Sequence, residues 1–106
     1  SIANEQIWTS TKTMSSVQNA FKHWKTHGHE FPDILNSKQY VEKARKFFTA
    51  HNDHLNKLRH NGELVIYDSK SNVFGAFTKN GVPKTMFKPD PAIHRYRTNL
   101  EYFNAQ

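Results

Sequence analysis

The strand-forming part of the chain is residues 55–88, which read LNKLRHNGELVIYDSKSNVFGAFTKNGVPKTMFK. Two Asn-Gly pairs, at 61–62 and 80–81, each lie between stretches in which apolar and polar residues alternate. An Asn-Gly pair in this setting favours a two-residue type I′ hairpin. We therefore expect an antiparallel meander of four strands, at about 55–60, 63–68, 73–78 and 82–88.

These turns fix the register that we expect in the sheet, because the residues on either side of a two-residue turn pair with each other. The expected pairs are His60–Glu63, Leu58–Val65, Lys79–Val82 and Ala76–Thr85. Alternation along the last strand then gives two faces unless a bulge intervenes near Pro83. One face carries Thr85 and Phe87, and the other carries Lys84, Met86 and Lys88.

A helix is expected just before the strands, with Ser37 as its N-cap. Its apolar residues follow the i, i+3, i+4, i+7 spacing of an amphipathic helix. They are Tyr40, Val41, Ala44, Phe47, Phe48 and His51. The opposite face is charged, as a solvated face should be, through Lys38, Glu42, Arg45 and Lys46.

An earlier helix is expected to begin at Ser15 or Ser16 and to end at Gly28 or before Pro32. Its apolar residues fall within a narrow arc of the helical wheel, which we expect to be buried. They are Val17, Ala20, Phe21, Trp24 and Gly28. His23 and His27 are four residues apart, so they lie on one side of this helix, with His27 at the border of the apolar arc.

The two ends of the chain complete the expected architecture. Residues 1–14 are polar apart from Ile7 and Trp8, and we expect a linker or an N-terminal arm that docks through Trp8. Residues 15–106 are expected to form a single α+β domain, in which N-terminal helices pack on a twisted antiparallel sheet of about four strands. The tail from Pro89 is expected to be irregular and to close over the core through aromatic and aliphatic residues. They are Tyr96, Leu100, Tyr102 and Phe103.

The chain is strongly basic, with a formal charge of +6 and a pI near 9.7, and it carries seven histidines. This charge favours a polyanionic partner such as nucleic acid. The sequence has no cysteine, which excludes a disulfide framework and a thiolate zinc site. No apolar run approaches the ~20 residues that a membrane-spanning helix needs.

Histidines, lysines and a hydroxyl are the groups needed for cleavage of RNA by its own 2′-hydroxyl, without a metal or another cofactor. This reaction needs a base, an acid and positive charge near the phosphate, and its products are a 2′,3′-cyclic phosphate and a 5′-hydroxyl. His27 is the leading candidate for proton transfer, and His23 is a second candidate. Lys25 and Lys84 could stabilise charge, and Thr85 could donate a hydrogen bond to the phosphate. Three further residues could bind substrate, namely Phe87, Lys88 and Tyr102. Of these, Phe87 could stack on a base.

Each of these residues also has an ordinary structural interpretation, because a histidine at a helix border is commonly a surface residue and Phe87 in a strand is commonly part of a core. A metal site is a further alternative. His23 and His27 have the spacing at which two imidazoles can meet one ion, but Trp24 stands where a His-Glu-x-x-His site needs glutamate. The segment 51–54 (His-Asn-Asp-His) resembles a nuclease metal finger only superficially.

Several phrases together resemble the C-terminal toxin domains of contact-dependent inhibition and Rhs-type polymorphic toxins. These phrases are residues 8–12, 16–21, 23–31, 84–90 and 102–106. More remotely, residues 27–31 (HGHEF) followed by a strand-rich half resemble the tRNase domain of colicin D, within the barnase, EndoU, colicin and RelE-like group. This resemblance implies metal-independent cleavage of tRNA, often in the anticodon loop.

Carried over by position, the motif histidine of colicin D falls on His27, and its Ser-x-Trp strand motif falls on residues 85–87, where Thr85 and Phe87 keep a hydroxyl and a ring. Thr26 stands where colicin D has lysine, so the phosphate-binding role would pass to Lys25, Lys84 or His23. The resemblance also implies delivery as the C-terminal part of a large secreted protein into the cytoplasm of a target cell. It further implies a monomeric toxin in a 1:1 complex with a cognate immunity protein. A metal-dependent DNase toxin and a non-catalytic basic RNA-binding module remain as alternatives.

Overall fold

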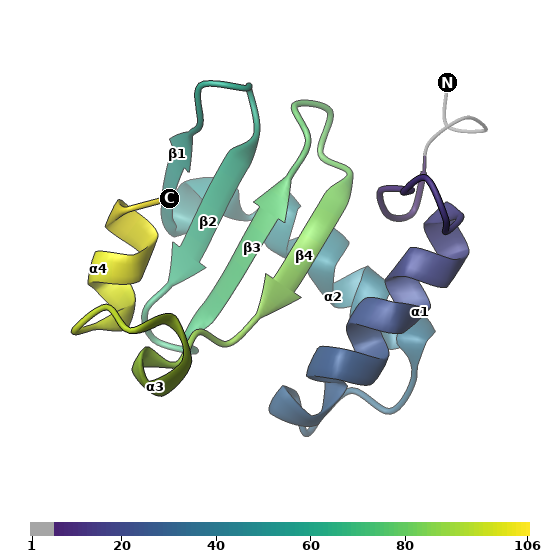
Figure 1. The fold of residues 1–106 in the computed structure, drawn as a ribbon, viewed down its shortest axis with the longest axis horizontal. Coiled ribbons are helices and arrows are strands. Elements are labelled where there is room, and N and C mark those ends of the chain that lie inside the picture. The colour runs from purple at the N-terminus through teal and green to yellow at the C-terminus, as the bar shows by residue number, and fades with distance from the viewer. Residues whose placement is uncertain (1–5) are drawn as a thin grey trace.

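Two α-helices precede a four-stranded antiparallel sheet in the computed structural model, which describes residues 6–106 (Figure 1). The helices are α1 (Ser16–His27) and α2 (Ser37–Thr49), and the strands are β1 (Leu55–Leu58), β2 (Leu64–Asp68), β3 (Val73–Phe77) and β4 (Pro83–Phe87). Short 3₁₀ turns, η2 (Gly28–Glu30) and η3 (His51–Asp53), follow α1 and α2. The strand order is β1-β2-β3-β4. The predicted α+β class and antiparallel meander are therefore confirmed.

The tail forms two further helices, α3 (Pro91–His94) and α4 (Asn99–Asn104), so the expectation of an irregular tail is wrong. Each begins at a side-chain cap: Asp90 accepts a hydrogen bond from the Ala92 amide, and Thr98 accepts one from the Glu101 amide. Phe103 is buried against the sheet as expected, whereas Tyr96 and Leu100 are largely exposed. No helix within residues 6–106 has the length and apolar character needed to cross a bilayer.

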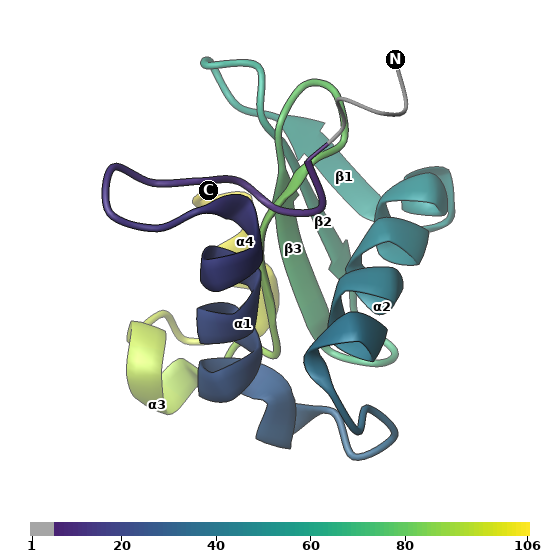
Figure 2. The same cartoon turned by 90° about the vertical axis from the view of Figure 1, so that its right-hand side faces the viewer.

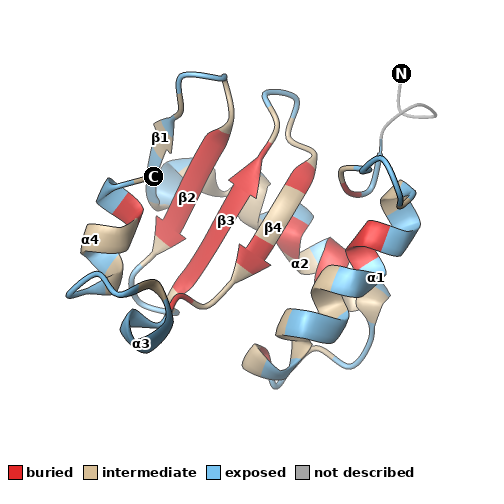
Figure 3. Ribbon diagram, viewed as in Figure 1, coloured by how far each residue is buried: buried red, intermediate tan, exposed pale blue. Residues whose placement is uncertain are grey.

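The two faces of the sheet are covered by different parts of the chain. Figures 1 and 2 show α2 across one face, α1 beyond the β4 edge, and α4 on the other side of the sheet. Side chains on the α2 face of β2 and β3, such as Ile66 and Phe77, join a core with Tyr40 and Trp8. The opposite face packs on Phe103 in a smaller cluster. Both faces are apolar, which explains why β2 and β3 are buried along most of their length (Figure 3).

The α2 helix follows the predicted pattern, with Tyr40, Val41 and Ala44 buried. Its N-cap is Asn36, whose side chain accepts a hydrogen bond from the Gln39 amide, so the cap lies one residue before the predicted Ser37. The Tyr40 hydroxyl donates a hydrogen bond to the carbonyl of Met86 in β4. This bond and the burial of the ring fix α2 against the last strand.

Ser15 caps α1, as expected, and forms a capping box with Gln18. Its buried face differs from the predicted arc, because Val17 and Phe21 are 65% and 49% exposed. Ala20 is buried as predicted and Trp24 is partly buried against the core, whereas Asn19, outside the predicted arc, is buried as well. Asn19 is accommodated because its side-chain amide donates a hydrogen bond to the Thr9 carbonyl at 2.8 Å.

The segment before α1 docks through Trp8, whose side chain is fully buried. The ring stacks on Tyr40 with a centroid distance of 5.3 Å and also contacts His23. The Thr9 amide donates to the Pro83 carbonyl at 3.0 Å, which ties the segment to β4. Residues 1–5, the first part of the expected linker or arm, lie outside the described residues.

Both hairpins have three-residue loops instead of two-residue type I′ turns. In the first, the Arg59 amide donates to the Glu63 carbonyl, and Gly62 has a φ of +87°. A type I′ turn needs positive φ at both central residues, whereas Asn61 is not among the described residues with positive φ. The second hairpin closes in the same way between Thr78 and Val82. Three predicted pairs are therefore wrong by one residue: His60–Glu63, Leu58–Val65 and Lys79–Val82.

The fourth predicted pair, Ala76–Thr85, is confirmed because a β-bulge offsets the longer loop. Phe77 pairs with Pro83 and Ala76 pairs with Thr85, so Lys84 is the extra residue on β4. The bulge also changes the direction of Lys84, which forms an ion pair with Glu63. The β-bulge near Pro83, which the sequence left open as an alternative to regular alternation, is therefore present.

Candidate active site

The His27 imidazole at the end of α1 forms a hydrogen bond with Glu30 in η2. Its Nδ1 lies 2.9 Å from Oε2 of Glu30, and both side chains are about one-fifth to one-quarter exposed. An ionised carboxylate can only accept, so Nδ1 carries the hydrogen and the neutral ring has its lone pair on Nε2. Nε2 has no hydrogen-bond partner among residues 6–106. A carboxylate that fixes the tautomer in this way leaves a ring nitrogen able to accept a proton.

The second oxygen of Glu30 connects this pair to the sheet. Oε1 accepts a hydrogen bond of 2.7 Å from the Lys88 amide, directly after β4. Both carboxylate oxygens are therefore used, one by the helix and one by the strand. This fixes the position of the imidazole relative to β4.

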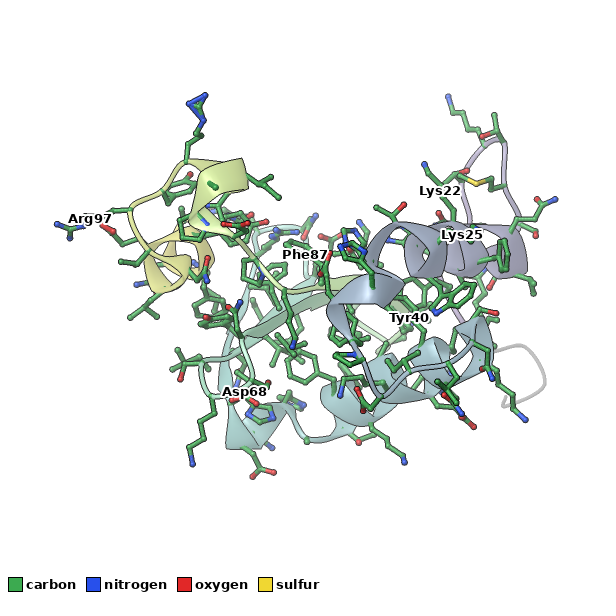
Figure 4. All side chains as sticks on the ribbon, turned by 90° about the horizontal axis from the view of Figure 1, so that it is seen from below. Lys22, Lys25, Tyr40, Asp68, Phe87 and Arg97 are labelled. Carbon is green, nitrogen blue, oxygen red and sulfur yellow. The ribbon has the colours of Figure 1, made fainter. Side chains whose placement is uncertain are left out.

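The Phe87 ring stacks on His27, with centroids 5.3 Å apart and an interplanar angle of 27°. Figure 4 shows Phe87 between α1 and the α3–α4 segment. The ring is only partly buried. A nucleobase next to the imidazole could therefore meet an aromatic surface.

His23 and Thr85 form a second contact between α1 and β4. Nδ1 of His23 lies 3.5 Å from Oγ1 of Thr85, and the His23 and His27 ring centroids are 6.2 Å apart. Burial, followed by the neighbouring charges of His27 and Lys22, lowers the pKa of His23 below its usual value. His23 therefore favours the neutral form more strongly than a free histidine does.

Lys84 is paired with Glu63, which also accepts a hydrogen bond from Arg59 at 3.0 Å. The hydrogen bond from Lys84 is the main reason why the pKa of Glu63 lies below its usual range. With two cations around one carboxylate, this cluster has one net positive charge. Lys84 directly precedes Thr85 in β4, so this cluster adds positive potential to that strand.

The other predicted substrate-binding residues lie in different settings. Lys25 is exposed on α1 (Figure 4). The Lys88 ammonium lies over the Phe31 ring, 5.6 Å from its centroid, and its backbone amide holds Glu30. Tyr102 packs edge-on against Phe87 at 6.3 Å, and burial raises the pKa of its hydroxyl.

Within the part of the chain that the structure describes, no three histidine, aspartate or glutamate side chains are placed to hold one ion. His54 of the 51–54 segment lies 3.7 Å from Asp68 and stacks near Phe47. This pair belongs to the α2 side of the sheet.

The fold is shared with a known ribonuclease. A solved structure of a ribonuclease from Escherichia coli, complexed with its inhibitor protein, is similar to this structure, with a TM-score of 0.50 and 22% sequence identity. The match covers 77% of this chain and 95% of that chain. No family model matches this chain, and no curated protein matches it. The likeness to the ribonuclease therefore concerns the arrangement of the backbone.

The structure brings His27, His23, Thr85 and Phe87 together, although α1 and β4 are far apart in the sequence. Glu30 also belongs to this group, through its contacts with His27 and the Lys88 amide, but it was not among the candidate residues predicted from the sequence. The sequence did contain an indication of the contact with His27, because Glu30 follows His27 by three residues at the end of a predicted helix. That spacing allows the two side chains to meet.

Proposed function

We propose that this protein is a ribonuclease that cleaves RNA by metal-independent transesterification. The observation that carries the proposal is the His27–Glu30 pair, which leaves Nε2 of His27 open beside the Phe87 ring. The charge of +6 suits a polyanionic substrate. The shared fold with a ribonuclease supports the same activity.

In the proposed reaction, Nε2 of His27 takes the proton from the 2′-hydroxyl, and the 2′ oxygen attacks phosphorus. The bond from phosphorus to the 5′ oxygen breaks, which leaves a 2′,3′-cyclic phosphate. The departing 5′ oxygen takes a proton from solvent, since His23 favours its neutral form, and the Thr85 hydroxyl donates a hydrogen bond to a non-bridging phosphate oxygen. The cluster around Lys84 stabilises the charge on the phosphate oxygens.

The activity is tested by incubating the purified protein with RNA in excess EDTA and analysing the ends. We expect cleavage that leaves 2′,3′-cyclic phosphate and 5′-hydroxyl ends. Cleavage that EDTA abolishes would favour a metal-dependent nuclease instead. Salt-sensitive binding without cleavage at stoichiometric protein would favour an RNA-binding module.

The role of Glu30 gives a sharper test of the proposed geometry. Glu30→Gln retains the size of the side chain but replaces an oxygen that must accept from His27 with an amide that can also donate. We expect kcat to fall by about 10- to 100-fold because the preferred tautomer of His27 is lost. The matched control is Glu42→Gln, which removes an exposed carboxylate on α2, away from the site. Equal kcat values for Glu30→Gln and wild type would contradict the role of Glu30.

We further propose that the ribonuclease is an antibacterial toxin domain of the contact-dependent inhibition or Rhs type, with tRNA as its substrate. The support is the set of sequence phrases described above, together with the inhibitor bound to the ribonuclease of shared fold. A cognate immunity protein would then neutralise it in the producing cell. Delivery would be as the C-terminal part of a large secreted protein into the cytoplasm of a target cell. Incubation with total tRNA, followed by mapping of the cut ends, tests the substrate; equal cleavage of all RNAs would contradict tRNA specificity.

A further inference from the structure

We propose that the ring cluster formed by His94, Tyr96 and Tyr102 is a second base-binding subsite, for an unpaired nucleotide next to the one held at Phe87. This inference rests on the proposed ribonuclease function. The ligand class is single-stranded RNA, whose bases are free to stack on aromatic side chains.

The cluster continues the aromatic surface of the active site without a break. Tyr102 contacts Phe87, which itself stacks on His27. Tyr102 also stacks on His94, with centroids 4.6 Å apart and an interplanar angle of 20°. Tyr96 packs against both of these rings, at 5.7 Å from His94 and 5.9 Å from Tyr102. A strand that leaves the phosphate at His27 along Phe87 therefore meets this cluster next.

The hydrogen bonds of His94 assign it to stacking and not to proton transfer. Its Nδ1 accepts a hydrogen bond of 3.0 Å from the Tyr96 amide, so the hydrogen of the neutral ring is on Nε2. Nε2 lies 2.8 Å from Oδ1 of Asn99, to which it donates. Both nitrogens are thus occupied within the protein. The ring is held in one plane, as a stacking surface requires.

Tyr96 supplies the accessible part of the cluster, since it is 44% exposed. The chain reaches it through Arg95, which has a φ of +74°, in the left-handed region that non-glycine residues rarely adopt. The backbone of α3 ends at this residue, whose amide donates to the Pro91 carbonyl at 3.0 Å. The unusual conformation therefore directs the chain so that the Tyr96 amide reaches His94.

Positive charge lies beside the rings. Arg95 is exposed, and the Arg97 side chain is 85% exposed, at the outer end of the α3–α4 segment (Figure 4). Arg97 pairs with Glu101 at 3.1 Å, but such a surface pair is weak and is screened by salt. The guanidinium group is therefore free to exchange this partner for an RNA phosphate.

Asn72, in the turn between β2 and β3, helps to hold the α3–α4 segment to the sheet, as does Lys57 in β1, which donates to the Asn104 carbonyl at 2.6 Å. Asn72 Oδ1 accepts hydrogen bonds from the Tyr67 hydroxyl and from the side chain of Asn99, at 2.8 and 3.0 Å. Its Nδ2 donates to the Pro89 carbonyl at 3.1 Å. The same Asn99 holds His94, so the rings have a fixed position relative to β3 and β4. Such preorganisation lowers the entropic cost of binding.

The subsite is tested with the full chain and a fluorescent single-stranded oligonucleotide whose riboses carry 2′-O-methyl groups, which prevent cleavage. Tyr96→Ala is expected to raise Kd about tenfold because a base–aromatic stack is lost. Tyr96→Phe retains the ring and is expected to bind as wild type does. Ile93→Ala is the matched control, since Ile93 is 79% exposed on the same segment and lies outside the ring cluster. Circular dichroism and thermal unfolding check that each variant is folded.

Abasic substitution along the oligonucleotide locates the contact. One abasic position is expected to weaken binding to wild type but to have little further effect on Tyr96→Ala. Equal Kd values for wild type and Tyr96→Ala, or equal binding of duplex and single strand, would overturn the subsite. If Tyr96→Ala binds more weakly but wild type cleaves no RNA, the ribonuclease proposal fails and the subsite stands. If wild type cleaves RNA and Tyr96→Ala is unaffected in binding and cleavage, only the subsite fails.

Discussion

Replacing His27 with alanine is expected to lower kcat/KM for RNA cleavage by about 10²- to 10⁴-fold, the usual contribution of one general base. The variant removes the Nε2 lone pair next to Phe87, and the rest of the fold has little reason to change. The His27 side chain is about one-quarter exposed and contributes one hydrogen bond, to Glu30. The initial rate with a single RNA oligonucleotide in EDTA is the measurement.

The control for His27→Ala is His60→Ala, because His60 is exposed in the loop of the first hairpin. His60→Ala makes the same substitution as His27→Ala, with the same effect on net charge, but away from the proposed site. We expect full activity in this variant. Full activity in a folded His27→Ala variant would instead remove the basis of the proposed mechanism.

Trp8→Ala is expected to lower the free energy of unfolding by about 3–5 kcal/mol, the usual cost of removing a buried aromatic side chain. Trp8 is fully buried and stacks on Tyr40, whose hydroxyl is bound to β4. The cavity would therefore form where the N-terminal segment, α2 and the sheet meet. Urea denaturation with an unchanged m-value measures the effect.

Two further variants separate the causes of this loss. Trp8→Phe retains most of the packing and removes the indole Nε1, which is buried without a hydrogen-bond partner among the described residues, so it is expected to cost less than Trp8→Ala. Ile7→Ala changes the adjacent residue, which is 38% exposed, and is expected to have a much smaller effect. A Trp8→Ala variant as stable as wild type would show that this segment contributes nothing to the fold.

The elements of the fold could be predicted where a single pattern dominated the sequence. The spacing of Tyr40, Val41 and Ala44 allows one buried face only, and α2 has it. In α1 the buried face includes Asn19 as well as apolar residues. Asn19 can be buried because the Thr9 carbonyl accepts a hydrogen bond from its side-chain amide. A polar residue with such a tertiary partner cannot be recognised from helical periodicity alone.

Register depended on the backbone dihedral angles of single residues. The pair Asn61-Gly62 is compatible with a two-residue or a three-residue loop, and the conformation of Asn61 decides between them. The helices of the tail, in contrast, had readable signals. Asp90 precedes a proline at the first helical position, and Thr98 has glutamate three residues later, as in a capping box.

For the candidate site, the sequence indicated which residues could take part, but not which residues they contact. The sequence indicated His27, Thr85 and Phe87, and the structure places them along one helix–strand contact. The partner of Lys84 depended on the bulge in β4, and the role of Glu30 depended on the Lys88 amide. Both are contacts between segments distant in the chain, which local patterns do not reveal.

The Glu30 carboxylate joins two segments that are 58 residues apart, and this has a consequence for the timing of activity. A newly made chain cannot hold the imidazole in its working orientation until the last strand has been added to the sheet. On the proposed chemistry, a nascent or unfolded copy is therefore harmless to the RNA around it. If the protein is a toxin, as proposed, the cell that synthesises it would need protection only from the finished molecule.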